Sequence, residues 1–244
     1  MFDLTDRVAV VTGGNGGIGL GMAVGLAKAG ARIAVFGRNL EKNAKSVATI
    51  EALGVEAASY AVDVTDATAI ASNVRAVAER FGRVDILINN AGMAVAKSAE
   101  DHTLEDWRTV MDTNVTSAFL CSQACRPEFL KAGGGKILNC GSMYSWFGSP
   151  FALAYSASKG AMVQLTKSLA VGWAKDNIQV NCFLPGWINT DMTDMAREAV
   201  PGLNELIVSR TPAGRWGEPA DLEGIAVFLA SRASDFITGT VIPV

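Results

Sequence analysis

The feature that most constrains the fold of this chain is a repeated alternation between short β-branched runs and longer amphipathic stretches. A run such as "VAVVT" at residues 8–12 has the length and composition of a buried strand. The stretches between the runs space their apolar residues as a helix with one buried face does. Strands are therefore expected at 8–12, 32–37, 57–64, 84–92, 135–142 and 178–186, and helices at 18–31, 40–54, 66–81, 103–131, 155–175 and 220–230.

Strands and helices that alternate in this way form βαβ units, which predicts an α/β fold with a mainly parallel sheet and helices on both faces. With 244 residues, half of them apolar, the chain can fill the core of one large domain, and no linker divides residues 1–244. Residues 187–215 follow a strand end and have weaker core periodicity. Because ligands of open α/β sheets bind beyond the carboxyl ends of the strands, this segment is a candidate lid.

The charge pattern argues against a nucleic-acid or membrane partner. The 21 basic residues are scattered among 24 acidic ones, so no basic stripe or patch stands out, and a small-molecule partner is favoured. The amino terminus reads neither as a signal peptide nor as a membrane span, which favours a cytoplasmic protein.

The sequence offers little to bind a metal. His102 is the single histidine, and it lies in a polar stretch typical of a surface position or helix cap rather than of a catalyst. The cysteines show no CxxC pair. We therefore expect no metal site, and we expect buried free thiols at Cys121, Cys125, Cys140 and Cys182.

A glycine-rich segment, "TGGNGGIG" at 12–19, joins the first expected strand to the first expected helix. Gly14, Gly16 and Gly19 satisfy G-x-G-x-x-G, whereas Gly13, Gly17 and Gly19 satisfy T-G-x-x-x-G-x-G. Either reading leaves backbone N–H groups exposed at a helix amino terminus, where a pyrophosphate is stabilised. A strand before the segment and a second strand about 20 residues later are the context of a dinucleotide site.

The end of the second expected strand bears on the choice of dinucleotide. An NAD site would place an acid there, but the chain has Gly37 followed by Arg38. An arginine suits the 2′-phosphate of NADP, so NADP is preferred and NAD remains possible. The alternative is that Arg38 faces solvent and binds no ligand.

Tyr155 and Lys159 lie four residues apart at the start of an expected helix, so they share one helix face. A tyrosine with an ordinary pKa of about 10 must be acidified by roughly three units, about 4 kcal/mol, to work near neutral pH. A cation about 4 Å away supplies about 1 kcal/mol in water but about 4 kcal/mol at an effective dielectric near 20. The pair therefore predicts a proton-transfer site only in a partly dry cleft.

Taken in order, these motifs resemble the short-chain dehydrogenase/reductase family over essentially the whole chain. The resemblance implies a single Rossmann-type domain with seven strands, a nicotinamide cofactor, and hydride transfer to or from an alcohol or ketone carbon. It rests on "TGGNGGIG", "DV" at 63–64, "NNAG" at 89–92, Asn114, Ser142, "YSASK" at 155–159, "PGWINT" at 185–190 and "GRWGEPADLEGIAVFLAS" at 214–231.

The resemblance also implies roles for individual residues. Tyr155 would donate the proton in reduction and accept it in oxidation, while Lys159 favours ionisation of Tyr155 and holds the nicotinamide ribose. Ser142 would hydrogen-bond the substrate oxygen as charge develops. Asn114 would hold a water that links Lys159 to solvent. Tyr144 does not stand at the required spacing and is expected in the pocket wall.

The cofactor contacts implied by the resemblance run along the whole chain. Asp63 and Val64 would flank the adenine, Asn90 to Gly92 the adenosine-side ribose, and Ile188 with Thr190 the carboxamide. The full set comprises Gly13, Asn15, Gly16, Gly17, Ile18, Gly19, Arg38, Asn39, Asp63, Val64, Asn90, Ala91, Gly92, Tyr155, Lys159, Pro185, Gly186, Ile188 and Thr190.

Substrate and assembly are less constrained. Ser142, Tyr155, Trp146 and Trp187 are the expected substrate contacts. The loops "GSMYSWFG" and "PGWINTDM" are similar to those of sugar and aldonate dehydrogenases, which favours a polyol, sugar, aldonate or cyclic ketone. A 3-oxoacyl carrier-protein reductase is the alternative, but such enzymes commonly show an arginine on the helix after YxxxK, where this chain has Val171.

Two further expectations concern function class and assembly. A non-catalytic dinucleotide-binding regulator would be expected to lose Tyr155, Lys159 or Ser142, and all three are present. The resemblance implies a homotetramer in which helices near 103–131 and 155–175 pair between subunits. The family usually continues past its last strand with an Asp-Gly-Gly turn, whereas this sequence stops at "TGTVIPV", so the contacts made there are left open.

Overall fold

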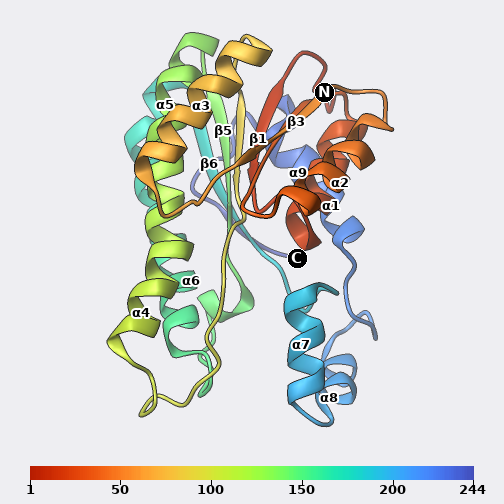
Figure 1. The fold of residues 1–244 in the computed structure, drawn as a ribbon, viewed down its shortest axis with the longest axis vertical. Coiled ribbons are helices and arrows are strands. Elements are labelled where there is room, and N and C mark those ends of the chain that lie inside the picture. The colour runs from red at the N-terminus through yellow and green to blue at the C-terminus, as the bar shows by residue number, and fades with distance from the viewer.

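The computed structural model describes residues 1–244, apart from the side chain at position 199. Its centre is a parallel sheet of seven strands in the order β3-β2-β1-β4-β5-β6-β7, which confirms the predicted α/β class and the seven strands (Figure 1). The strands are β1 (Val8–Thr12), β2 (Arg32–Gly37), β3 (Ala57–Ala61), β4 (Ile86–Asn89), β5 (Gly135–Cys140), β6 (Ile178–Leu184) and β7 (Val241–Pro243).

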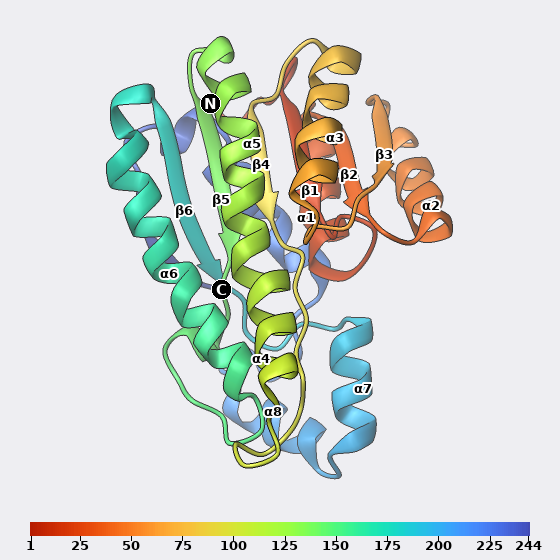
Figure 2. The same cartoon turned by 60° about the vertical axis from the view of Figure 1, so that its left-hand side comes forward.

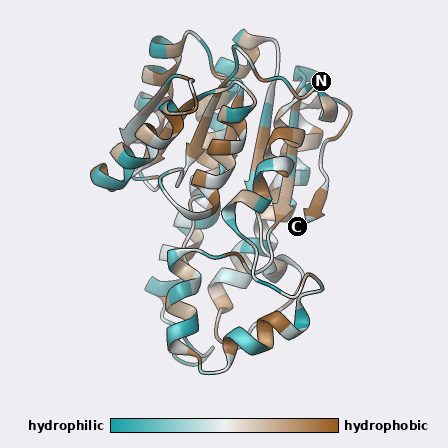
Figure 3. Cartoon of the chain, turned by 90° about the vertical axis from the view of Figure 1, so that its right-hand side faces the viewer, coloured by the Kyte–Doolittle hydropathy of each residue, from teal (hydrophilic) through white to brown (hydrophobic). Residues whose placement is uncertain are grey.

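Alternate residues of the strands pack into two separate cores, one on each face of the sheet. Ala9 and Val11 contribute to the core shared with α1 (Gly17–Lys28), α2 (Leu40–Glu51) and α9 (Glu223–Ala230). Val8 and Val10 face the opposite core, which is completed by α3 (Ala67–Phe81), α5 (Ser117–Ala132) and α6 (Leu153–Trp173). Figure 2 shows α3, α5 and α6 side by side over one face, and Figure 3 shows the apolar strands between the helix layers. Burial on both faces explains why the strands read as continuous apolar runs.

The helix expected at 103–131 is interrupted by a π-helical turn. Thr103 caps α4 (Leu104–Met111), a π-helical turn follows at Asp112–Thr116, and α5 continues to Ala132. A π turn inserts an extra residue, shifts the side chains that follow, and often occurs at functional sites. Asn114 lies inside this turn.

The apolar runs of the sequence did not predict one strand, β7. β7 has only three residues, too few to show periodicity, but it pairs in parallel with β6. The 3-10 turns lie at Met143–Ser145, Ala174–Asp176, Pro219–Leu222 and Arg232–Ser234. Among the residues that the structure describes, none of the helices combines the length and the apolar character needed to cross a membrane.

The candidate lid contains two helices, α7 (Asp191–Ala199) and α8 (Leu203–Arg210), which lie beyond the carboxyl ends of the strands (Figure 1). Trp216 joins them to each other. Its ring packs edge-on against Trp187 at 5.4 Å between centroids and lies 4.5 Å from the Arg197 guanidinium of α7. Its Nε1 donates to Asn204 Oδ1 of α8 at 3.0 Å. The segment is thus one packed unit, and its movement as a lid stays a prediction.

Candidate active site

A cavity of about 310 Å³ opens beyond the carboxyl ends of the central strands. This is where open α/β sheets bind ligands. The loops after β1, β4, β5 and β6 line it together with the amino-terminal parts of α1, α2, α6 and α7. The lining residues are Gly13, Asn15, Gly16, Gly17, Ile18, Lys42, Asn90, Ala91, Gly92, Cys140, Gly141, Ser142, Tyr155, Lys159, Pro185, Gly186, Ile188, Thr190, Asp191, Met192 and Thr193.

The backbone decides between the two readings of the glycine-rich segment. Gly13 and Gly17 have positive φ values of 62° and 49°, a conformation that favours glycine. A Cβ on Gly19 would lie 2.3 Å from the Gly13 carbonyl oxygen. These are the glycines of T-G-x-x-x-G-x-G, so this reading describes the loop.

The start of α1 fits the pyrophosphate of a dinucleotide. Gly16 precedes the helix and makes no side-chain cap, so the N–H groups of the first turn are free for a ligand. No described atom lies within 4 Å of the position that a Cβ on Gly16 would take, so a ligand can approach the backbone there. Exposed N–H groups and the helix dipole both favour an anion at this place.

Hydrogen bonds between neighbouring loops hold this cradle in position. The Thr12 hydroxyl oxygen accepts from the backbone N–H groups of Asn90 and Ala91, each at 3.0 Å. Asn90 Nδ2 in turn donates to the carbonyl oxygens of Thr12 and Gly13 at 3.1 and 3.2 Å. The loops after β1 and β4 therefore form one rigid wall of the cavity.

Four of the predicted adenosine contacts do not line the cavity: Arg38, Asn39, Asp63 and Val64. Asn39 caps α2 by accepting from Lys42 N at 2.9 Å, and Val64 is buried in the core. The N–H and hydroxyl of Thr65 donate to Asp63 and lower the pKa of Asp63, with a lesser effect of the nearby, exposed Arg38. Cofactor contact at these four positions stays a prediction.

The end of β2 is closed by an asparagine pair that the sequence did not reveal. Asn15 Nδ2 donates to Asn43 Oδ1 at 2.7 Å, and Asn43 Nδ2 donates to the Gly37 carbonyl oxygen at 2.8 Å. A Cβ on Gly37 would lie 2.3 Å from Asn15 Nδ2 and 2.6 Å from Asn43 Oδ1. The position where an NAD site would carry an acid therefore has no room for a side chain.

Ser142, Tyr155 and Lys159 all line the same cavity. Lys159 is 3% exposed; its Nζ donates to the Cys140 carbonyl oxygen at 2.7 Å and lies 5.4 Å from the Tyr155 ring centroid. Burial opposes the charge of Lys159, but neighbouring Tyr155 favours it, and the pKa of Lys159 is raised. The cleft thus holds a dry cation beside a tyrosine, the condition that the sequence argument required.

Asn114 fixes the loop after β4 to the helix that carries the tyrosine. Its Oδ1 accepts from Met93 N at 2.8 Å, and its Nδ2 donates to Met93 O at 3.0 Å and to Ser158 Oγ at 2.9 Å. Ser158 Oγ donates to the Tyr155 carbonyl oxygen at 2.7 Å. The side chain of Asn114 is thus occupied by protein partners, and its part in holding a water stays a prediction.

Ser145 is a positioning residue that sequence reasoning missed. Its hydroxyl donates to the Lys159 carbonyl oxygen at 2.7 Å and accepts from the backbone N–H of Ser142 at 3.2 Å. It therefore ties the serine loop to α6, and no sequence motif marks it. Tyr144 packs its ring edge-on against Tyr155 at 6.2 Å between centroids, but it does not line the cavity, so its expected place in the pocket wall stays a prediction.

The two tryptophans expected to contact substrate do not line the cavity. Trp146 is 52% exposed, and Trp187 packs against Trp216 instead. Met192 and Thr193 of α7 line the cavity in their place. Only the structure reveals these two residues, because their distance from the cavity depends on the direction that the chain takes between β6 and α7.

The cysteines are all free and buried, as predicted. Burial raises the pKa of Cys121 and Cys182 to about 12 in each case. No group of three or more His, Cys, Asp or Glu side chains among the described residues could hold a metal ion. His102 is half-buried in the loop before α4 and does not line the cavity.

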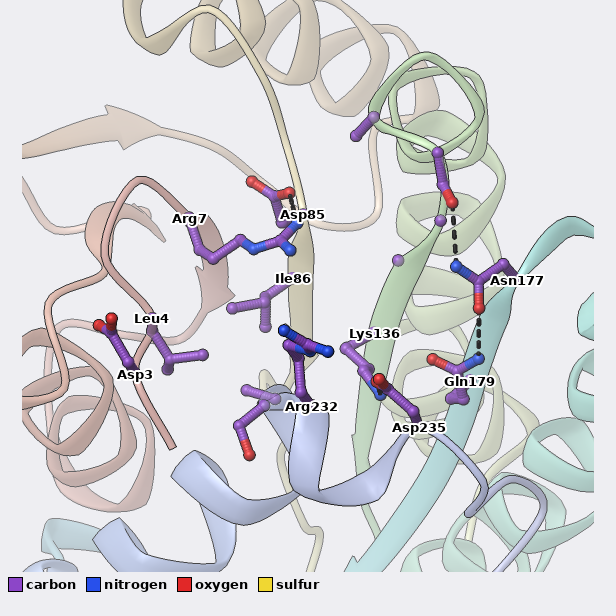
Figure 4. A pocket seen from close by; sticks show the side chains of 16 residues that line it. Asp3, Leu4, Arg7, Asp85, Ile86, Lys136, Asn177, Gln179, Arg232 and Asp235 are labelled. Carbon is purple, nitrogen blue, oxygen red and sulfur yellow. Dashed lines mark hydrogen bonds and ion pairs between the residues drawn. The ribbon is translucent and has the colours of Figure 1, made fainter. Parts of the chain in front are cut away.

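A second cavity, of about 200 Å³, lies at the amino ends of β4, β5 and β6 (Figure 4). Four of its charged lining residues form two ion pairs. Arg7 bonds Asp85 at 2.7 Å, and Lys136 bonds Asp235 at 2.8 Å. Burial lowers the pKa of Lys136 despite this pairing. The cavity has neither the phosphate cradle nor the tyrosine, so the first cavity is the candidate active site.

Comparisons with known proteins agree with this geometry. A family model described as Enoyl-(Acyl carrier protein) reductase matches residues 13–244. The chain is 42% identical to a 2-dehydro-3-deoxy-D-gluconate 5-dehydrogenase of Dickeya dadantii and 40% identical to a gluconate 5-dehydrogenase of Gluconobacter oxydans, covering 100% of this chain and 95% of each relative. The crystal structure of a Burkholderia cenocepacia gluconate 5-dehydrogenase with NADP and tartrate superposes with a TM-score of 0.94 at 37% identity, covering 100% of this chain and 95% of that one.

Proposed function

The chain belongs to the short-chain dehydrogenase/reductase family, and from this premise we propose that it interconverts a hydroxyl and a keto group on a sugar acid or a related polyol. It is an NAD(P)-dependent oxidoreductase that acts on CH–OH donors. The observation that carries the proposal is the meeting of the phosphate cradle with Ser142, Tyr155 and Lys159 in one cavity. A bound nicotinamide would supply or accept the hydride.

The protein side of the reaction follows from the placement of three side chains. In reduction, the Tyr155 hydroxyl donates its proton to the carbonyl oxygen as the carbon gains hydride, and in oxidation the same oxygen takes the proton back. Ser142 donates a hydrogen bond to that oxygen while it carries charge. Lys159 stabilises the tyrosinate and can hold ribose hydroxyls, because its buried amine faces Tyr155 and lines the cavity.

Two relatives support the substrate class. They are named as dehydrogenases of gluconate and of 2-dehydro-3-deoxy-D-gluconate, and this chain matches 95% of the length of each. The alternative, a 3-oxoacyl carrier-protein reductase, is disfavoured by Val171, which is 84% exposed where those enzymes commonly present an arginine. A panel of aldonates, keto-aldonates, polyols and acetoacetyl thioesters, followed by NAD(P)H absorbance, tests this. Turnover confined to the thioesters would replace the proposed substrate class.

Within the use of a nicotinamide coenzyme, we propose a preference for NADP. The closed position at Gly37 supports it, because the asparagine pair leaves no room for the acid that binds the ribose of NAD.

We also propose a cytoplasmic homotetramer. Exposed apolar side chains on α5 and α6, including Phe119, Leu130 and Val171, support pairing of these helices between subunits.

Arg38 is the residue expected to meet the 2′-phosphate. Hydrogen bonds to charged groups contribute about 1.5–3 kcal/mol, so Arg38→Ala should weaken NADPH binding about 10- to 150-fold and change NADH binding little. Arg38→Asp should invert the preference, because it repels the phosphate. Dissociation constants for both cofactors measure this.

Gly37→Asp is the matched control, since it adds a carboxylate where the structure leaves no room for one. It should damage binding of both cofactors rather than create an NAD site. The NADP assignment fails if the wild-type protein binds NADH more tightly, or if Arg38→Ala weakens both cofactors equally.

A further inference from the structure

An ion pair bridges the mouth of the candidate active site. Lys42 Nζ on the first turn of α2 lies 2.6 Å from Asp191 Oδ2 on the first turn of α7. Both residues line the cavity beside Gly16 and Gly17 of the phosphate cradle. The pair therefore joins the dinucleotide-binding half of the chain to the lid, directly at the place expected to receive phosphates.

The cavity lining contains few charged side chains, and they lie in two different places. Among the described residues that line the cavity, the cations are Lys42 and Lys159, and the single carboxylate is Asp191. Lys159 faces Tyr155 and Cys140, so Lys42 is the cation beside the phosphate cradle. The hydrogen bond from Lys42 holds the pKa of Asp191 below its ordinary value, so this carboxylate is charged at neutral pH.

The ion pair between Lys42 and Asp191 contributes little to the stability of the fold. The side chains of Lys42 and Asp191 are 53% and 84% exposed, and ion pairs this exposed contribute little to stability. A carboxylate next to a phosphate site also repels the ligand unless a cation neutralises it. Both the exposure of the ion pair and the carboxylate beside the phosphate site are explained if the partner of Lys42 changes when the cofactor binds.

We propose that Lys42 is shared between the lid and the cofactor: it pairs with Asp191 in the free protein and binds a phosphate group of the dinucleotide in the complex. The backbone of Lys42 is fixed by the Asn39 cap, while its long side chain can change partner. Phosphate binding then frees the first turn of α7 from α2, which couples the cofactor to the position of the lid. This inference rests on the proposed nicotinamide-dependent function.

The sharing predicts effects of opposite sign on cofactor binding. Lys42→Ala removes the cation and exposes Asp191, so the dissociation constant of NADPH should rise about 10- to 100-fold. Asp191→Asn removes the competing carboxylate and frees Lys42, so the same constant should fall about 3- to 10-fold. Both are measured by titrating NADPH and NADH into the substrate-free protein and following fluorescence, which does not require turnover.

Matched controls exist on the same helices. Lys45→Ala removes a lysine one turn further along α2, where Lys45 pairs with Glu41 at 2.7 Å, and Asp194→Asn removes a charge from α7. Both should leave the NADPH constant within about twofold, on the magnitude usual for surface charges. Equal effects of Lys42→Ala on NADH and NADPH assign Lys42 to the pyrophosphate, and an effect confined to NADPH assigns it to the 2′-phosphate.

Two results would overturn the proposal. If Asp191→Asn weakens NADPH as Lys42→Ala does, the pair is a clasp that persists in the complex. If Lys42→Ala behaves like Lys45→Ala, Lys42 does not bind phosphate. Either result leaves the dehydrogenase function intact, whereas a wild-type protein that binds neither cofactor would refute that function itself.

Discussion

Replacing Tyr155 by phenylalanine is expected to reduce turnover by about 10³-fold or more while leaving cofactor affinity within about threefold of wild type. Positioned acid–base groups contribute about 10²- to 10⁴-fold to rates, and the change removes only the hydroxyl proposed to carry the proton. The ring contacts with Tyr144 and Lys159 remain, so the cavity should keep its shape. Steady-state rates with an aldonate substrate and NADPH titrations measure the two effects separately.

Tyr144→Phe is the internal control for this experiment. Its ring packs against Tyr155 from the neighbouring loop, so the loss of its hydroxyl should change the rate less than about tenfold. If Tyr155→Phe kept activity within tenfold of wild type, the proton would have to come from another group, and Tyr144 would be the next to test.

The second large effect is expected at Lys159, because we propose that its one buried amine acts on both the tyrosine and the cofactor. Lys159→Ala should lower turnover at least about 100-fold and also weaken NADPH binding about 10-fold or more. It differs in this from Tyr155→Phe, which affects the rate alone. Rates and dissociation constants measured on the same preparations give the comparison.

Lys159→Arg tests whether a positive charge alone is sufficient. The amine lies 3% exposed against the Cys140 carbonyl, a space suited to a compact ammonium rather than to a planar guanidinium. Arginine should therefore restore only part of the activity and should shift the pH profile of turnover. A variant that matched wild type at every pH would contradict the proposed role of the lysine as a compact, buried charge.

The class of the fold could be predicted from the sequence because strands buried on both faces leave an unmistakable pattern. The short β-branched runs at the centre of the sheet need helices above and below them, and such an arrangement is typical of a mainly parallel sheet. The same pattern overextended the strand expected at 84–92, since only Ile86–Asn89 pairs with its neighbours before the loop turns into the cavity. β7 was too short for periodicity to reveal it.

The sequence also predicted that Tyr155 and Lys159 lie together, because their spacing places both on one helix face whatever surrounds that helix. It could not choose between two glycine readings, since both present free N–H groups. The choice depended on backbone angles at Gly13 and Gly17 and on the close approach of Gly19 to the Gly13 carbonyl.

By itself, then, the sequence determined the features that depend on a repeating pattern or on local spacing: the parallel α/β fold, the glycine-rich loop, and the tyrosine–lysine pair. Only the tertiary structure decided which distant residues meet there. The Asn15–Asn43 pair over Gly37, the link from Ser145 to Lys159, and the ion pair between Lys42 and Asp191 join segments 14 to 149 residues apart. Such contacts leave no periodic trace, because each depends on the angle at which one loop leaves the sheet and on the neighbour that it then meets.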